Sequence, residues 1–261
     1  MTTSEDAAAT SPAELPRLIA LLWGMAQEGE RGPKRGLSLE QILDTAIALA
    51  DAEGYSALSM NRIAKELGFT AMSLYRYVDS KQTLVQLVLD RIIGPPPAIE
   101  AEGDWRTGLR AWAVAEFETG ARHPWWLDIP VVGPPMGPNN MAWLEAGLAT
   151  LKHTTLPEAM RLQLVMNLSL YVVGRSWAAR DFIVEAEAEA GYDFEAAMRT
   201  VLDPARFPAL FSALAHRAFE ADIDWSRADF EFGLDRMLDG YERYIGSAES
   251  AGPAGFAADG S

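Results

Sequence analysis

Cysteine is absent from the 261 residues, and histidine occurs only three times. A chain without cysteine cannot form disulfides, thiolate metal sites or a thiol nucleophile. Three scattered histidines also argue against a histidine-based zinc site. We therefore expect no metal and no other cofactor. With 49% hydrophobic residues, the chain is long enough to build its core from apolar packing alone.

Long apolar runs are missing as well, and so is a basic leader. Residues 1–12 are acidic and rich in Ala, Ser and Thr, whereas a secretory signal begins with a basic segment. The longest apolar stretch near this end, Leu18 to Met25, is far shorter than the roughly 20 residues that span a bilayer. The sequence predicts a cytoplasmic protein without membrane contact and with a disordered start.

Basic residues are few: 22 Lys and Arg stand against 37 Asp and Glu, which gives a net charge of −15. Binding to nucleic acid depends on Lys and Arg, so this sum at first argues against it. The charges are unevenly distributed, however. Residues 95–261 hold 13 basic and 25 acidic side chains, whereas residues 31–81 hold 7 and 6. A small, near-neutral domain that meets DNA, with an acidic body turned away from it, fits this distribution.

Apolar residues at helical spacing are abundant in the first third of the chain. Ser38 and Gln41 form a capping box at the start of one helix, and Gly54 and Gly68 are helix-ending signals. The triple proline at 95–97 cannot continue a helix, so we place a domain boundary there. Helices are expected at about 18–25, 38–53, 59–67, 70–77 and 80–93.

The remainder of the chain also has helical spacing, and no alternating segment is long enough for a strand. A loop with five prolines and two adjacent Trp interrupts it at 124–138. We expect an all-α protein, in which a three-helix helix-turn-helix DNA-binding domain precedes a larger helical ligand-binding and dimerisation domain. The expected helices are 104–122, 139–152, 156–189, a weaker pair near 192–219, and 225–246. The expected domains are an extension at 1–36, the DNA-binding domain at 37–94, the larger domain at 95–246 and a disordered tail at 247–261.

The tight link Gly68-Phe69-Thr70 between two short helices is the most informative local feature. In a helix-turn-helix the first helix supports the second, whose outer face enters the major groove of DNA. By spacing, only Leu74 and Val78 of the second helix belong to the core. The other side chains suit base edges and phosphates. The alternative is that Tyr75 and Tyr77 cap the small core and that Arg76 is an ordinary surface charge.

The run from Ser59 to Lys81, SMNRIAKELGFTAMSLYRYVDSK, followed by Leu84-Val85, resembles the DNA-binding domain of the TetR family of transcription regulators. The resemblance extends from about Leu37 to Ile93. It implies base contacts from Thr70, Ala71, Met72, Ser73 and Arg76, and phosphate contacts from Tyr75, Tyr77, Lys81, Met60 and Asn61. Asn61 departs from the pattern, because the tetracycline repressor has a base-reading arginine there; a different operator sequence is expected.

The arm before the first domain helix, Arg31 to Gly36, carries Lys34 and Arg35 between glycines and a proline. Such an arm can enter the minor groove beside a recognition helix or touch phosphate. The alternative is a solvated linker. We favour DNA contact because the arm directly precedes the DNA-binding domain.

The body resembles the C-terminal domain of the tetracycline-repressor subfamily, through Asp104-Trp105-Arg106, Arg122-His123-Pro124 and the segment 230–234 (FEFGL). That resemblance implies an effector pocket and places Glu116 in it. Six of the chain's eight Trp could line a cavity closed by the proline-rich loop, or could simply be packing residues: Trp105, Trp112, Trp125, Trp126, Trp143 and Trp177. Three polar residues at intervals of four could orient a ligand or form a polar seam in a dimer bundle. The expected effector residues are Trp112, Glu116, Trp126, Trp143, Asn167, Tyr171 and Arg175.

A broad apolar stripe on the last helix, from Phe230 to Ile245, is wider than one domain needs. Pairing of this helix and of 156–189 with a second copy predicts a homodimer, which suits a palindromic operator. We expect a repressor that a small aromatic or polycyclic effector releases from operator DNA. The alternative is a ligand-independent or activating regulator of the same fold. No arrangement of residues typical of an enzyme is evident.

Overall fold

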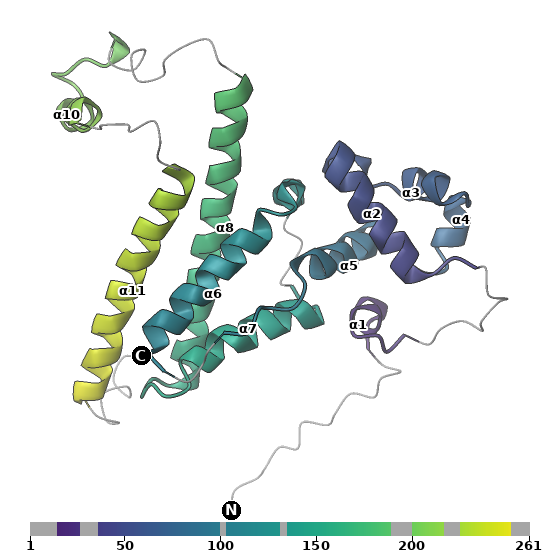
Figure 1. The fold of residues 1–261 in the computed structure, drawn as a ribbon, viewed down its shortest axis with the longest axis horizontal. Helices are drawn as coiled ribbons and strands as arrows, with labels where there is room; N and C mark the ends of the chain where they lie inside the picture. Colours follow the sequence, from purple (N-terminus) through teal and green to yellow (C-terminus); the bar gives the residue numbers. More distant parts are fainter. Residues whose placement is uncertain are drawn as a thin grey trace, which may run out of the picture.

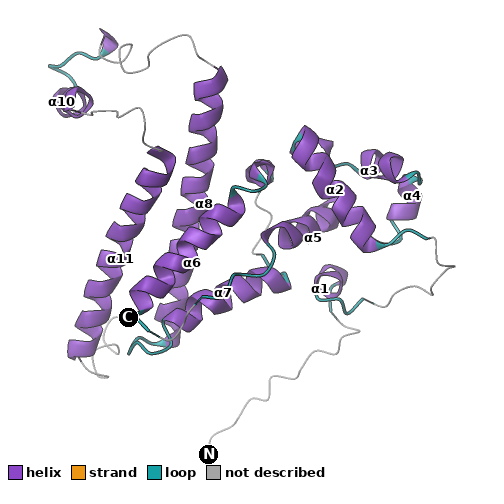
Figure 2. Cartoon of the chain, in the orientation of Figure 1, coloured by secondary structure: helices purple, strands orange, loops and turns teal. Residues whose placement is uncertain are grey.

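The computed structural model describes residues 15–26, 36–99, 103–130, 135–188, 200–216 and 225–251. All regular elements in these ranges are helical, which confirms the all-α prediction (Figure 2). In chain order they are α1 Arg17–Leu22, α2 Leu39–Glu53, η2 Tyr55–Ala57, α3 Met60–Leu67, α4 Ala71–Leu74, α5 Lys81–Ile93, α6 Trp105–Gly120, η3 Pro124–Asp128, α7 Pro138–Thr150, α8 Glu158–Ala188, α10 Pro208–His216 and α11 Trp225–Ala251. None of the described helices combines the length and the apolar character needed to cross a membrane.

The helices of the N-terminal domain begin and end at the predicted capping residues. The Ser38 hydroxyl accepts the backbone N–H of Gln41 at 3.1 Å, and the Gln41 side chain accepts the backbone N–H of Ser38 at 2.9 Å, so the capping box is confirmed. Ser59 and Ser80 cap α3 and α5 through their hydroxyl groups. Gly68 ends α3 with φ of 75°, a left-handed conformation that other residues adopt only with strain.

Helices α2 to α5 enclose one small core. Leu74 and Val78 are fully buried in it, as their spacing predicted. Because these two residues fix α4 from below, its remaining side chains are left on the outside. The fully buried members are Ile42, Ala46, Leu58, Ile63, Leu74, Val78, Leu84 and Val88.

The proline-rich segment does not lie where the sequence predicted. We expected it to close a cavity between the body helices, but Trp125 and Ile129 are buried in the core of the N-terminal domain. The Trp125 indole donates to Oδ1 of Asp51 at 2.7 Å, and Nδ1 of His123 lies 2.7 Å from the same oxygen. Burial of a large ring whose N–H is paired stabilises this position. The segment therefore joins the two domains.

The body is a helical bundle in which α6, α8 and α11 pack against one another and α7 packs against α6 and α8 (Figure 1). The rings of Phe117 on α6 and Phe230 on α11 stack with centroids 4.2 Å apart. The buried apolar residues of the bundle are Leu109, Trp112, Ala113, Trp143, Leu151, Leu156, Val165, Leu168, Val172, Phe230, Leu234, Leu238, Ile245 and Ala248.

The last helix is longer than predicted. We expected it to end at residue 246 and the tail to be disordered from Ser247, but α11 continues to Ala251. Ile245 and Ala248 are both buried in the body, so packing continues past the predicted end and holds the extra turn. The rest of the predicted tail lies outside the described residues. Of the predicted helical pair near 192–219, residues 200–216 are described and contain α10.

Candidate DNA-binding surface and effector site

The outer face of α4 and of the turn after it carries most of the predicted DNA contacts. Met72 is 75% exposed and Tyr75 43% exposed, while Leu74 between them is completely buried. Arg76 is exposed, and Thr70 and Ser73 share a hydrogen bond of 3.0 Å between their hydroxyl oxygens. Hydrogen-bond donors, hydrogen-bond acceptors and the apolar side chain of Met72 thus lie together on one surface. Such a set can read base edges and bind phosphates.

The other predicted contacts divide into three groups. Asn61 and Lys81 are exposed, and the Lys81 ammonium lies 4.9 Å above the ring of Tyr55. Ala71 and Tyr77 are partly buried and pack against the core, so the alternative in which tyrosines cap the core describes Tyr77 better than Tyr75. Lys34 and Arg35 lie outside the described residues.

Met60 corrects one prediction. Its side chain is 6% exposed and belongs to the core of the N-terminal domain. Burial of this apolar side chain, at the first position of α3, is more favourable in free energy than its exposure to water. The side chain is therefore not available as a phosphate contact. Only the backbone of this residue can face DNA.

A nearby arginine is engaged within the domain. Arg62 of α3 pairs with Glu53 at 2.8 Å and with Glu66 at 2.6 Å. These two hydrogen bonds, chiefly the one to Glu53, raise the pKa of the guanidinium above its usual value. At Arg76, in contrast, the contact is made by the backbone: its carbonyl oxygen accepts a hydrogen bond from Nη2 of Arg17 at 3.2 Å. Arg76 is therefore the better arginine candidate for DNA.

Helix α1 makes contacts that the sequence did not reveal. Arg17 reaches the carbonyl of Arg76 and lies 3.9 Å from the Asp79 carboxylate. At the other end, the Trp23 indole donates to the backbone oxygen of Met136 at 3.0 Å. The helix itself was predicted from its apolar residues, but its contacts depend on groups more than fifty positions away. It links the end of the recognition region to the segment before α7.

Asp90 forms a second connection between the domains. This buried residue of α5 accepts the backbone N–H of Asn140 at 3.1 Å and that of Asn139 at 3.4 Å, and both Asn side chains also donate to it. It thus caps the N-terminus of α7, which has no side-chain cap of its own. A Cβ atom at Gly137 would lie 2.0 Å from Oδ1 of Asp90, so this approach requires glycine.

Two of the expected effector residues are packing residues of the core. Trp112 is 1% exposed and Trp143 is 3% exposed, and their rings meet edge to face with centroids 6.3 Å apart. The Trp112 indole donates to the backbone oxygen of Trp143 at 2.8 Å, and the Trp143 indole donates to that of Gly94 at 3.0 Å. Trp143 therefore contacts the end of α5 directly. Trp126 is partly buried, and its indole donates to the backbone of Gly120.

The polar stripe on α8 is mainly a seam with α11. The Tyr171 hydroxyl donates to the backbone oxygen of Phe230 at 2.7 Å, and burial raises the pKa of this tyrosine. Arg175 lies 3.4 Å from the Asp229 carboxylate. Asn167, the third member of the stripe, is exposed. The sequence left open a ligand contact or a seam between two chains of a dimer, whereas Tyr171 and Arg175 contact α11 of their own chain.

Glu116 and Arg175 each keep one buried side-chain atom without a hydrogen-bond partner in the described part of the chain, Oε2 of Glu116 and Nε of Arg175. The Oε1 atom of Glu116 accepts the Ser169 hydroxyl at 2.7 Å, while its Oε2 is closed off from solvent. Burial raises the pKa of the Glu116 carboxyl to about 7, and the hydrogen bond from Ser169 opposes this shift. A buried carboxyl with one unpaired oxygen is typical of a binding site.

The described cavity lies elsewhere. A hollow of about 390 Å³ opens at the domain junction, between the end of α2, the end of α6 and η3. Its charged walls include Asp128 and Arg180, which pair at 2.6 Å. It contains none of the expected effector residues.

Comparison with known proteins identifies the chain. The family model for bacterial regulatory proteins of the tetR family matches residues 42–88, and the model for the tetracyclin repressor-like C-terminal domain matches residues 97–245. The chain belongs to the TetR family. The resemblance seen in its recognition region is thereby confirmed, and the helix-turn-helix domain is that of a transcription regulator.

TetR-family relatives match along most of the chain. The transcriptional repressor DrrR1 of Streptomyces coeruleorubidus is 36% identical over 240 residues, which cover 88% of this chain and 86% of the relative. A helix-turn-helix repressor of Mycobacterium tuberculosis is 28% identical over 87% of this chain and 88% of its own length. The crystal structure of ActR from Streptomyces coelicolor in complex with actinorhodin has a TM-score of 0.65 and 26% identity, covering 81% of this chain and 98% of ActR.

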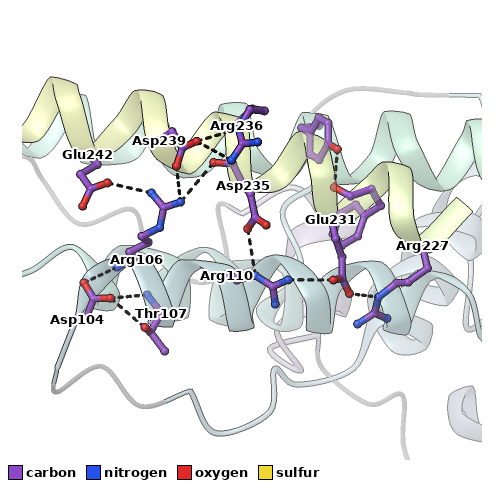
Figure 3. A network of polar contacts seen from close by, with 12 residues as sticks. Asp104, Arg106, Thr107, Arg110, Arg227, Glu231, Asp235, Arg236, Asp239 and Glu242 are labelled. Carbon is purple, nitrogen blue, oxygen red and sulfur yellow. Dashed lines mark hydrogen bonds and ion pairs between the residues drawn. The ribbon is translucent and has the colours of Figure 1, made fainter. Parts of the chain in front are cut away.

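A ladder of ion pairs joins α6 to α11 in this TetR-family body (Figure 3). Arg106 pairs with Asp239 at 2.6 Å, and Arg110 pairs with Glu231 at 3.0 Å. Hydrogen bonds from Arg227 and Arg110 hold the pKa of Glu231 below its usual value. Arg106 and Glu231, one from each of the motifs at 104–106 and 230–234 and more than a hundred residues apart, are therefore members of the same α6–α11 ladder, in which each pairs with other residues.

The outer face of α8 carries an apolar stripe in this TetR-family body. Its members follow one another at intervals of three or four residues, so they share a side of the helix. They are exposed in the single chain, whereas such residues are normally buried. The stripe consists of Leu162, Met166, Leu170, Val173 and Trp177.

Proposed function

We propose that the protein is a ligand-responsive repressor, which binds a palindromic operator as a dimer and is released by a small aromatic or polycyclic effector. One observation carries the DNA-binding part: Met72, Tyr75 and Arg76 are exposed on a short helix that buried Leu74 and Val78 hold in place. We assign DNA binding to residues 37–94 and effector binding with dimerisation to the body, in the cytoplasm.

Relatives support the repressor and effector parts of this proposal. DrrR1, at 36% identity, is named a transcriptional repressor. ActR, a TetR-family protein, has been solved with actinorhodin and with (S)-DNPA, and its chain in the latter complex is 25% identical to this one. Similar bodies therefore hold small molecules, and we carry this property over to the body described here.

The exposed apolar stripe on α8 supports the dimer. Phe232, which is 66% exposed, and Tyr244 extend the apolar surface onto α11. Pairing of α8 and α11 with the same helices of a second chain would bury both surfaces in a four-helix interface. A two-fold axis through this interface would present two recognition helices to half-sites about 34–36 Å apart.

The contacts at the domain junction support a route for release. Helix α5 belongs to the N-terminal domain. Near its C-terminal end, Asp90 accepts a hydrogen bond from the start of α7, and the Trp143 indole donates to the backbone of Gly94. We propose that an effector moves α7 or α6 and thereby turns α5, which changes the spacing of the two recognition helices. The effector must prefer the released state by about 5.5 kcal/mol to shift the dimer from 1:99 to 99:1.

The test begins with selection of an operator from random double-stranded DNA by the purified chain, followed by sequencing and measurement of stoichiometry. We expect a palindromic site that binds two chains. Aromatic and polycyclic compounds are then titrated into the complex, and release is followed by fluorescence anisotropy. A failure to enrich any sequence argues against specific DNA binding, while a site that no compound ever releases identifies a ligand-independent regulator.

A further inference from the structure

The Glu116 carboxyl lies in the seam between α6 and α8, and only one of its two oxygens has a hydrogen-bond partner among the described residues. Ser169 of α8 donates to Oε1, while Oε2 meets neither solvent nor a donor among the described residues. In a folded protein nearly all buried polar atoms are paired. An unpaired carboxyl oxygen therefore needs an explanation, and a missing ligand is one.

Comparison with Glu118, two residues further along α6, shows that this helix can supply carboxylates with partners. Glu118 pairs with Arg227 at 2.8 Å on the outside of the bundle. The carboxylates of α11 are paired with Arg106 and Arg110 in the same way. Glu116 alone in this group points into a seam where only a hydroxyl meets it.

Charged groups on the neighbouring helices are engaged elsewhere. On α8, Arg175 pairs with Asp229 and Arg180 pairs with Asp128. On α7, Glu145 is exposed. Nε of Arg175 is itself buried without a hydrogen-bond partner in the described part of the chain, whereas the Glu116 carboxyl has the Ser169 hydroxyl as its hydrogen-bond partner there.

An aromatic surface lies one helical turn away from Glu116. The Trp126 indole donates to the backbone of Gly120, and a Cβ atom at that glycine would lie 3.4 Å from Nε1 of Trp126 and 3.8 Å from the Ser176 hydroxyl. Residues four apart share a face of a helix, so the carboxyl and the indole occupy the same side of α6.

We infer that the effector is a planar aromatic compound with a protonated amine, and that this amine binds Oε2 of Glu116 in the α6–α8 seam. A cationic amine supplies both the missing hydrogen bond and the missing counter-charge, whereas a neutral hydroxyl supplies only the first. The acidic segment 95–261, with 25 Asp and Glu against 13 Lys and Arg, attracts cations as well. This inference rests on the proposed effector binding of the body.

The test uses the full-length chain and two probes of the same shape, anthracenylmethylamine and anthracenemethanol. Binding is measured by calorimetry with the wild type, with Glu116→Gln and with the control Glu118→Gln, which alters a carboxylate of the same helix that is already paired. We expect the wild type and the control to prefer the amine by about tenfold or more, as a charge-assisted hydrogen bond allows. In Glu116→Gln the preference should fall below about twofold.

The pH dependence provides a second readout. Because burial raises the pKa of Glu116 to about 7, the carboxyl ionises between about pH 6 and pH 8, and affinity for the amine should rise over this interval in the wild type. Glu116→Gln should remove the rise. Affinity that falls over the interval would mean that a protonated carboxyl donates to the ligand, which contradicts the inference.

Three further results would overturn the inference: equal binding of the two probes, binding that Glu116→Gln leaves unchanged, and no binding of the amine. The operator-release assay separates this failure from failure of the proposed function. Compounds without an amine that release the operator would leave the function intact and remove Glu116 from effector recognition. An amine that binds through Glu116 without releasing the operator would support the role of Glu116 in binding and contradict the proposed release by an effector.

Discussion

The N-terminal domain and the body place their candidate functional residues differently. In the N-terminal domain, Met72, Tyr75 and Arg76 lie outside a core that is complete without them. In the body, Trp112 and Trp143 are part of the core, and Glu116 lies between two packed helices. Substitutions on the first surface should change DNA binding without changing stability. Substitutions in the body should change both.

The largest effect is expected for Trp112→Ala. Removal of this buried ring leaves a cavity among α6, α7 and α8, which should lower the free energy of unfolding by about 3–5 kcal/mol. Urea denaturation followed by circular dichroism measures the change. If Trp112→Ala unfolds at the same urea concentration as the wild type, the ring is not part of the core, and the contrast between the domains is lost.

Asp90→Ala tests the connection between the domains. It leaves the first backbone N–H groups of α7 without their cap, and we expect a loss of about 2–3 kcal/mol in the free energy of unfolding. Asp44→Ala serves as the control, because Asp44 is an exposed partner of Arg91 and should contribute less than about 1 kcal/mol. Equal losses in both variants would show that the cap at α7 is unimportant.

Arg76→Ala tests the N-terminal surface. The selected operator should bind more weakly by on the order of 1–3 kcal/mol and lose preference at one position of each half-site, while the urea midpoint stays that of the wild type. Lys81→Ala should instead weaken all DNA sequences alike. Sequence-resolved binding distinguishes the two. A change in the urea midpoint of Arg76→Ala comparable to that of Asp90→Ala would contradict the proposed separation of function from stability.

Glu116→Gln tests whether the buried carboxyl of Glu116 lowers the free energy of unfolding when it is ionised. Because burial raises the pKa of Glu116 from 4.5 to about 7, the folded state binds this proton more tightly than the unfolded state. The stability that this proton provides is fully present below the unfolded pKa and is lost as the pH rises through the folded pKa. The variant should therefore match the wild type near pH 4.5 and exceed it by up to about 3 kcal/mol at pH 8, since one pKa unit corresponds to about 1.4 kcal/mol. Urea midpoints that never diverge between these pH values would show that the carboxyl is adequately solvated.

The smallest effect is expected for the arm. Replacing both Lys34 and Arg35 by Ala should flatten the dependence of log affinity on log salt by up to about 0.9 for each lost phosphate contact. The substitution is preferable to deletion of the N-terminus, because deletion would also remove α1 and its contacts to Arg76 and Met136. Binding measured at several salt concentrations provides the slope, and an unchanged slope would make the arm a linker.

The sequence alone determined the features that depend on neighbouring residues. Ser38 with Gln41 encoded the start of α2, Gly68 encoded the left-handed end of α3, and the spacing of Leu74 and Val78 separated the buried from the outward side of α4. Capping and helical periodicity act within about four residues, so they are legible before any tertiary contact is known. The family resemblance of the recognition region depends on the same local pattern.

Only the tertiary structure decided which distant groups meet. Asp90 caps a helix 49 positions away, and Trp125 pairs with Asp51 at a separation of 74. The polar stripe at Tyr171 gave no sign that its partner is the backbone of α11. The family resemblance singled out Glu116, but only the structure shows that one of its carboxyl oxygens is buried without a partner among the described residues. The free energy of a buried polar atom depends on its partners and its access to water, and both are fixed only when helices from separate parts of the sequence pack together.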